Sequence, residues 1–283
     1  MSREGYIIPY HRFNYFHAGQ GNNMQAYINY LISYAAPVKN FIKPEASLIM
    51  VDSGLLSGAK KEGIAFTRKQ NDVIKYAESI NADRVVMMDI PMFPDILKAL
   101  EVTVDQAWNI HFENTRLFAI NPTKIRKVFV IQGPYTYLYD YCCQNMKDSI
   151  TENDIIAIGG LKNRSTNINE IIAILEIVTT YFPFNEIHLL GVGALETLAA
   201  VVPRFNITQS DSTTASQYTN LYKYISLPSK NNLTSYSLHT FLDLELKSDT
   251  RTRRLMAHYN QILWETAIWS KVQKAIEVKN ELF

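Results

Sequence analysis

The sequence predicts an α/β fold, a (β/α)8 barrel with a short helical extension at its C-terminal end. Short runs rich in Val, Ile, Leu or Phe alternate along the chain with longer segments of helical periodicity, which is the element order of a parallel α/β protein. Most of the runs lack polar alternation, as expected of strands covered on both faces. The 283 residues suit one barrel of about 250 residues with an addition. A doubly wound open sheet is the alternative fold.

Six of the apolar runs are predicted to be strands. In chain order they cover residues 47–54, 85–91, 127–133, 154–160, 186–193 and 205–211, of which the last has the weakest pattern. The segment GYIIPY, at residues 5–10, is a seventh candidate. These runs approach the eight strands of a barrel, with one strand left unplaced.

Helices are predicted between these strands and at the end of the chain. Thr103 is a good N-cap type for one of them. The predicted helices cover residues 66–80, 104–119, 168–181 and about 252–279. No Pro- or Ser-rich linker divides the chain, and residues 227–235 are the best loop candidate. We therefore expect a catalytic barrel over residues 1–225 and a helical extension packed on it over residues 226–283.

Composition excludes several classes of protein. Hydrophobic residues make up 47% and charged residues 19% of the chain, which argues against disorder. The net charge of +1 excludes binding of nucleic acid by bulk positive charge, but not by a local basic patch. The chain has no long apolar segment, so we expect neither a signal peptide nor a membrane span, and a cytoplasmic location.

The two cysteines, Cys142 and Cys143, are adjacent and cannot form a disulfide framework. The sequence has no CxxC pair and no HExxH motif. We therefore expect no metal site and no cofactor.

Polar residues and glycines gather where the predicted strands end. In a parallel barrel these ends meet on the face that carries active sites. Carboxylates and an amide around one pocket suit recognition of a polar heterocycle and nucleophilic or acid/base chemistry. Helix capping and simple turns are the alternative roles for these residues. The strand-end residues are Asp52, Asp89, Gln132, Gly159, Gly160, Gly191, Gly193 and Asp211.

Six motifs at these positions make the chain resemble the tRNA-guanine transglycosylases and their relatives that insert 7-deazaguanines into DNA. The similarity covers about residues 45–215 in order and spacing. The motifs are VDSG (51–54), MMDIP (87–91), VIQG (130–133), AIGGL (157–161), HLLGVG (188–193) and ITQSDS (207–212). The resemblance implies a (β/α)8 barrel, in agreement with the strand pattern.

The resemblance also implies roles for individual residues. Asp211 matches the nucleophile that attacks the anomeric carbon of the target nucleotide, and Asp52 matches the general acid/base. Asp89 matches the carboxylate that accepts hydrogen bonds from the guanine N1–H and amine. Gln132 and the N–H of Gly160 match donors to the O6 carbonyl. The Leu161 backbone matches the position beside the 7-substituent, and Gly159 and Gly191 belong to the same base-binding set.

Three departures from the family pattern stand out. The base is expected to lie between Leu56 and Leu190, where the family has an aromatic residue and a methionine. Residues 162–165 replace an acidic segment that adapts the family to different 7-substituents. Residues 212–283 contain no cysteine, so the zinc cluster of the tRNA enzymes is missing.

The missing zinc region favours DNA over tRNA as the substrate, as in the relatives of phages and DNA-modification clusters. Exchange in tRNA and a non-catalytic partner subunit remain alternatives, as does an unrelated glycosidase using the same carboxylates. A homodimer is a further option. The predicted nucleic-acid contacts are Lys162, Arg164, Lys247, Arg251, Arg253 and Arg254.

The alternating tyrosines of residues 135–141 are predicted to be partly packed and partly exposed. If residues 135–146 form a helix, these side chains cannot share one face, so we do not expect them to form a stacking platform.

Overall fold

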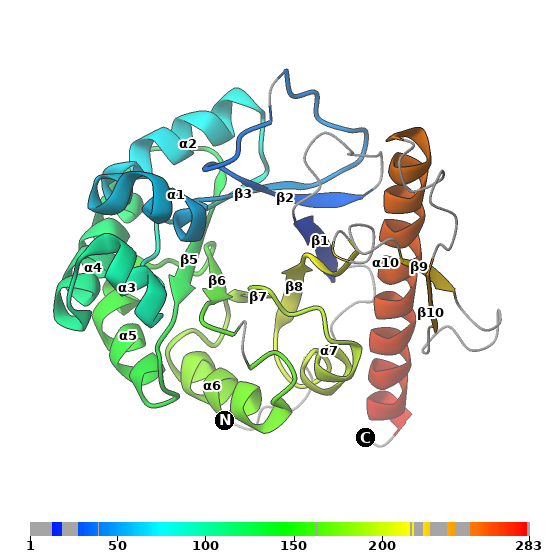
Figure 1. Cartoon of the computed structure of the whole chain (residues 1–283). Coiled ribbons are helices and arrows are strands. Elements are labelled where there is room, and N and C mark those ends of the chain that lie inside the picture. The colour runs from blue at the N-terminus through cyan, green and yellow to red at the C-terminus, as the bar shows by residue number, and fades with distance from the viewer. Residues whose placement is uncertain are drawn as a thin grey trace.

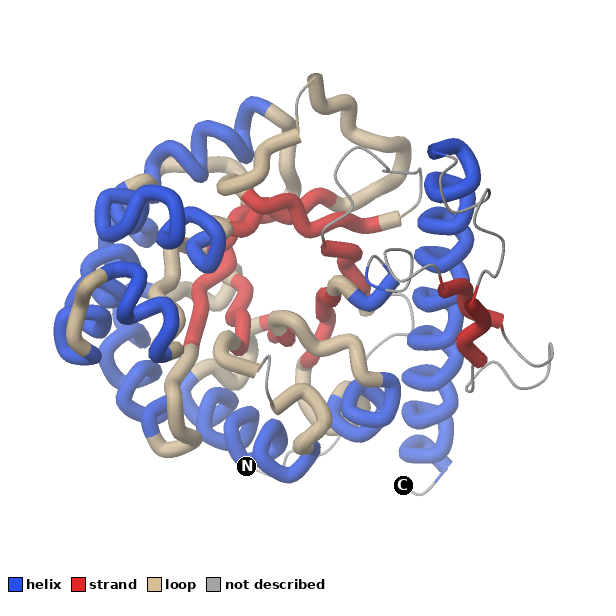
Figure 2. Tube along the Cα trace, viewed as in Figure 1, coloured by secondary structure: helices blue, strands red, loops and turns tan. Residues whose placement is uncertain are grey.

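The computed structural model describes residues 13–18, 28–38, 40–161, 164–215, 217, 223–226, 237–240 and 250–281. Eight parallel strands pair in sequence order, and the last closes on the first, so the sheet is a closed barrel. Figure 1 and Figure 2 look into this ring, with the helices around it. The chain therefore has the predicted (β/α)8 barrel fold. The barrel strands are β1 (Asn14–Ala18), β2 (Asn29–Ser33), β3 (Ile49–Asp52), β4 (Arg84–Val86), β5 (Arg126–Ile131), β6 (Ile155–Ile158), β7 (Glu186–Leu189) and β8 (Ile207–Ser212).

Helices surround the barrel from the end of β3 onward. They are α1 (Leu55–Glu62), η2 (Gly63–Arg68), α2 (Gln70–Ser79), α3 (Pro94–Leu100), α4 (Val104–Ile120), α5 (Leu138–Met146), η3 (Lys147–Ser149), α6 (Ile168–Tyr181) and α7 (Leu195–Val201). After β8 come a two-stranded antiparallel sheet of β9 (Lys223–Ser226) and β10 (Ser237–Thr240), and the long helix α10 (Thr250–Glu281).

The six strands predicted from apolar runs are β3 to β8. The candidate GYIIPY lies outside the described residues. The first two barrel strands are instead NYFHA and NYLIS, whose polar residues concealed them. Helix α4 begins after Thr103, which forms a capping box with Gln106, as its residue type predicted. The helix predicted over residues 66–80 is divided at Lys69, because its first turn is a 3-10 helix.

Helix α10 covers the outer face of the first strands. In the described residues no helix follows β1 or β2, and Figure 1 shows α10 running beside β1 and α7. The Trp264 indole Nε1 donates to the Tyr15 hydroxyl over 3.0 Å, and that hydroxyl also hydrogen-bonds Ser212. His17 lies 3.5 Å from the Glu265 carboxylate. The polar residues of β1 are thus explained by the helix that they face.

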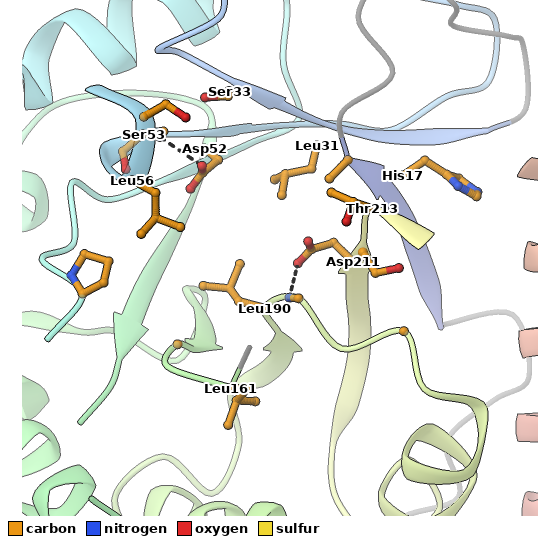
Figure 3. A pocket seen from close by; sticks show the side chains of 18 of the residues that line it. His17, Leu31, Ser33, Asp52, Ser53, Leu56, Leu161, Leu190, Asp211 and Thr213 are labelled. Carbon is orange, nitrogen blue, oxygen red and sulfur yellow. Dashed lines mark hydrogen bonds between the residues drawn. The ribbon is translucent and has the colours of Figure 1, made fainter. Parts of the chain in front are cut away.

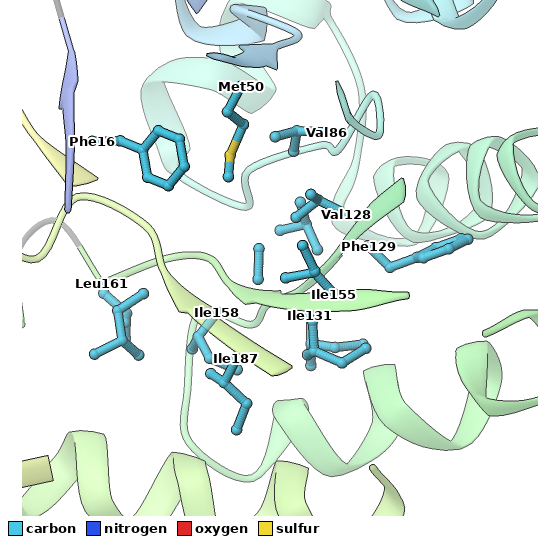
Figure 4. Packing of buried hydrophobic residues seen from close by; sticks show 14 of the residues in the cluster. Phe16, Met50, Val86, Val128, Phe129, Ile131, Ile155, Ile158, Leu161 and Ile187 are labelled. Atoms are coloured by element: carbon cyan, nitrogen blue, oxygen red, sulfur yellow. The ribbon is translucent and has the colours of Figure 1, made fainter. Parts of the chain in front are cut away.

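Buried aliphatic and aromatic side chains fill the barrel. Figure 4 shows some of them: Phe16 and Met50 point to the interior of the ring, whereas Phe129 points outward to the helices, where it packs on Phe118 of α4. Phe16, Met50, Val128 and Ile155 are fully buried. This packing fixes the strand ends, on which the candidate site is built. No helix in the described part of the chain has the length and apolar content to cross a membrane.

Candidate active site

A cavity of about 1080 Å³ lies at the carboxyl end of the barrel. It is the face on which barrel enzymes bind their substrates. Figure 3 shows side chains from β1, β2, β3 and β8 and from the loops after β6 and β7 around it. All ten residues predicted for catalysis and base binding line this cavity: Asp52, Leu56, Asp89, Gln132, Gly159, Gly160, Leu161, Leu190, Gly191 and Asp211.

The Asp211 carboxylate is held through one of its two oxygens. Its Oδ1 accepts hydrogen bonds from the His188 Nε2, at 2.9 Å, and from the Gly191 N–H, at 3.0 Å. His188 is fully buried on β7, so this contact keeps the proton on Nε2. Gly191 has a φ of 73°, which only glycine adopts without strain, and this turn aims its N–H at the carboxylate. Oδ1 is thereby occupied, and Oδ2 is the oxygen with capacity for a ligand.

Asp52 and Asp89 lie close enough to influence each other. Burial raises the pKa of Asp52 to about 6, although the Gly54 N–H donates to its Oδ2 over 2.9 Å. Burial, with the charge of Asp52, raises the pKa of Asp89 to about 8, and a hydrogen bond with Ser53 opposes this shift. At neutral pH the Asp89 carboxyl is therefore mostly protonated.

The segment that carries Asp89 is held from behind by three buried side chains. Gln70 accepts the Met88 N–H over 2.5 Å, and the Asn114 amide donates to the Met88 carbonyl over 3.0 Å. The Ile90 N–H donates to the His111 Nδ1 over 3.3 Å. Burial lowers the pKa of His111 to about 4, so the ring is neutral, with its proton on the Nε2 that faces the Val130 carbonyl. Asp89 thus projects from a fixed backbone.

Gln132 and the turn after β6 form the floor of the cavity opposite. The Gln132 amide nitrogen donates to the Ile90 carbonyl over 2.7 Å. Gly160 has a φ of 75°, and a Cβ there would lie 2.9 Å from the Tyr139 hydroxyl. That hydroxyl donates to the Gly159 carbonyl over 2.6 Å. The Gln132 amide nitrogen also lies 3.3 Å from the His111 Nδ1, so both N–H groups of Gln132 have partners within the protein.

Of the basic residues predicted to contact nucleic acid, the structure describes the side chain of Arg164 alone. Arg164 donates to the Pro134 carbonyl and lies 3.2 Å from the Glu170 carboxylate, so protein groups already engage its guanidinium. Lys162 and Lys247 lie outside the described residues. Arg251, Arg253 and Arg254 are in the first turns of α10, but their side chains are not among those described.

Sequence reasoning missed the residues that support the site. His188 stands in a quoted motif but was assigned no role. His111 and Asn114 occupy the buried face of α4 with Ala107 and Phe118, a helical spacing at which polar residues are unusual. Buried polar residues on an apolar helix face were therefore a usable signal.

No group of three His, Cys, Asp or Glu residues suited to a metal ion occurs among the described residues. Cys142 and Cys143 are buried as free thiols in α5, and burial raises the pKa of both.

Neither the scan against models of protein families nor the comparison with curated proteins found a match for this chain.

Proposed function

We propose that the protein exchanges guanine for a 7-deazaguanine in DNA through a covalent aspartyl-glycosyl intermediate. The observation that carries this proposal is the cavity itself. It brings Asp52, Asp89, Gln132 and Asp211 together, and it orients Asp211 through one oxygen. The six-motif resemblance assigns a transglycosylase role to each of these residues.

Asp211 is the proposed nucleophile. Its Oδ2 attacks C1′ of the target deoxyguanosine, the C1′–N9 bond breaks, and its electron pair leaves with the base. An ester between Asp211 and C1′ results. The incoming deazaguanine then attacks the same carbon through its ring nitrogen, and the Asp211 carboxylate is released.

Asp52 is the proposed proton carrier. Its pKa of about 6 leaves a useful fraction protonated near neutral pH. The acid form gives its proton to the departing guanine, and the carboxylate form takes the proton of the incoming base. The two half-reactions therefore balance without another proton carrier.

Asp89 is the proposed reader of the base. A carboxylate accepts two hydrogen bonds from the N1–H and amine of a guanine-like edge. Since its pKa is about 8, base binding at neutral pH requires release of the Asp89 proton. Leu56 and Leu190, which also line the cavity, supply apolar faces for the ring.

DNA is preferred to tRNA because residues 212–283 contain no cysteine for the zinc region of the tRNA enzymes. A duplex target requires extrusion of the nucleotide, as enzymes that act on bases commonly do. A cavity of about 1080 Å³ has room for a nucleoside.

The test is incorporation of labelled guanine and labelled 7-deazaguanine into DNA and into unmodified tRNA. We expect label in DNA only. Label in tRNA only would replace the proposed substrate, and label in neither would exclude the activity for the chain alone. The Asp211→Asn variant is the matched control for label carried over without chemistry.

A further inference from the structure

Two exposed tyrosines lie in the second half of the loop between β5 and α5. Tyr135 is 61% and Tyr137 67% exposed. Their rings are parallel, at an interplanar angle of 3° with centroids 5.8 Å apart. A stacked pair covers only one face of each ring, so the outer faces are open to another flat group. We call this pair the tyrosine ledge.

The ledge differs from the expectation for this segment. Helix α5 begins at Leu138, so its periodicity does not apply to Tyr135 and Tyr137. Tyr139 is buried, and Tyr141 packs against Trp108. The expected mixture of packed and exposed tyrosines is present, but the two most exposed ones, Tyr135 and Tyr137, stack on each other.

The ledge adjoins the cavity. The Tyr135 carbonyl lies 3.2 Å from where a Gly133 Cβ would stand, and the Gly133 carbonyl lies 3.4 Å from the equivalent point of Gly160. Gly160 lines the cavity. The backbone of the ledge therefore lies close to the base-binding floor, although neither tyrosine lines the cavity itself, and the loop is at the carboxyl end of the barrel, where a nucleic-acid strand would have to enter.

Hydrogen bonds brace the loop beneath the rings. The Arg164 guanidinium donates to the Pro134 carbonyl, and the Thr136 hydroxyl donates to Glu170 over 3.4 Å. The Leu138 N–H donates to the Tyr135 carbonyl over 3.0 Å. A braced loop presents its rings at little entropic cost, which is what a stacking partner requires.

We propose that the tyrosine ledge stacks against a nucleobase next to the target nucleotide. This inference rests on the proposed function. A nucleotide extruded into the cavity leaves its neighbour without a stacking partner, and an aromatic ring replaces that contact for any base. Parallel rings beside the entrance fit such an occupant because a base extends the stack.

The experiment compares the double variant Tyr135→Ala/Tyr137→Ala with Tyr135→Phe/Tyr137→Phe. Phe184→Ala is the matched control, because Phe184 is 64% exposed and precedes β7, at the opposite end of the barrel. Fluorescence anisotropy measures affinity for a labelled single-stranded oligonucleotide that contains one guanine. Calorimetry measures binding of free 7-deazaguanine, and melting temperature verifies folding.

We expect the double Ala variant to bind the oligonucleotide about 10- to 100-fold more weakly. The Phe variants and Phe184→Ala should stay within about threefold of wild type, since a phenyl ring stacks as a phenol does. Free-base affinity should not change. In base exchange, the double Ala variant should have a higher KM for DNA than wild type.

If the double Ala variant keeps the DNA affinity and the KM of wild type, the tyrosine ledge does not stack against a nucleobase. The proposed function would still be supported in that case by exchange of base in DNA by the wild-type protein. A loss confined to tRNA binding would overturn DNA as the occupant. If the wild-type chain exchanges base in neither DNA nor tRNA, the proposed function itself is wrong.

Discussion

The two ends of the barrel treat polar side chains in opposite ways. At the amino ends of the strands, Glu186 of β7 accepts from Arg126 over 2.8 Å, from Thr208 over 2.9 Å and from Gln209 over 3.3 Å. At the carboxyl ends, Asp52, Asp89 and Asp211 face a cavity of about 1080 Å³. The Glu186 carboxylate thus has its donors within the protein, whereas the Asp211 carboxylate accepts from the protein through Oδ1 and keeps Oδ2 for a ligand.

The pKa values follow the same division. Burial acts to raise the pKa of Glu186, but the hydrogen bond and charge of Arg126 outweigh burial and lower it. Among the described residues no cation contributes to the pKa of Asp89, and burial with the charge of Asp52 raises it to about 8. Glu186 thus serves stability and the proposed site lies at the carboxyl end, so substitutions at the two ends should have separable effects.

Asp211→Asn should give the largest effect. It keeps the shape of the side chain but removes the nucleophile, so base exchange should fall at least about 1000-fold. The melting temperature should stay within about 2 °C, because the amide oxygen still accepts from His188 and Gly191. Exchange assays and thermal melts measure the two effects. Full activity in this variant would refute the nucleophile assignment.

The His188→Phe substitution should have the second-largest effect on base exchange. The variant removes the donor to Asp211 Oδ1 and leaves only the Gly191 N–H. His188 acts through Asp211 as a positioning residue, so kcat should fall about 10- to 100-fold while the KM for DNA is nearly unchanged. His188→Gln keeps an N–H donor and should recover part of the loss. A change in KM alone, or no rescue by Gln, would contradict this role.

Glu186→Ala should alter stability and leave exchange nearly intact. The variant leaves Arg126, Thr208 and Gln209 without their shared acceptor, at a cost of about 1–3 kcal/mol in the free energy of unfolding. Glu196→Ala is the control, since its ion pair with Lys271 has a carboxylate side chain that is 74% exposed. That variant should cost less than about 0.5 kcal/mol. Urea denaturation compares the two variants, and equal losses would contradict the difference between the partly buried pair of Glu186 and the exposed pair of Glu196.

The free energy of unfolding should also depend on pH through Asp89. In the folded chain Asp89 has a pKa of about 8, against an ordinary value of 3.8 for aspartate, so the folded state holds the extra proton between these pH values. The free energy of unfolding should therefore fall as pH rises through this window, by up to about 1.4 kcal/mol per pH unit. Asp89→Asn should remove this decline between pH 6 and 8. Urea midpoints at several pH values measure it, and an identical decline in the variant would show that Asp89 is not its source.

The sequence predicted the carboxyl end of the barrel better than its first strands. Strands β3 to β8 are covered on both faces and read as apolar runs, so their terminal residues could be placed by counting. In strands β1 and β2, the side chains of His17, Tyr15 and Tyr30 contact α10, which is more than 200 residues away along the chain. A local sequence pattern cannot predict a contact with so distant a helix. The contact between His188 and Asp211 likewise joins neighbouring strands, and it depends on the register of β7 and β8, which shifts between Ile187 and His188.

The tyrosine ledge escaped prediction for a related reason. Its rings meet because the start of α5 falls at Leu138, and a shift of a few residues in that boundary would scatter them. Helix boundaries are less reliably predicted than the helices themselves.

The most direct test of the central claim is capture of the covalent intermediate. Wild-type protein incubated with a guanine-containing oligonucleotide, without added base, should yield a protein–DNA species that survives denaturing electrophoresis. Mass spectrometry should locate the sugar on the peptide that carries Asp211. Asp211→Asn should yield none, whereas Asp52→Asn should still bind free base. An adduct of equal yield in Asp211→Asn, or one located on another residue, would contradict the account.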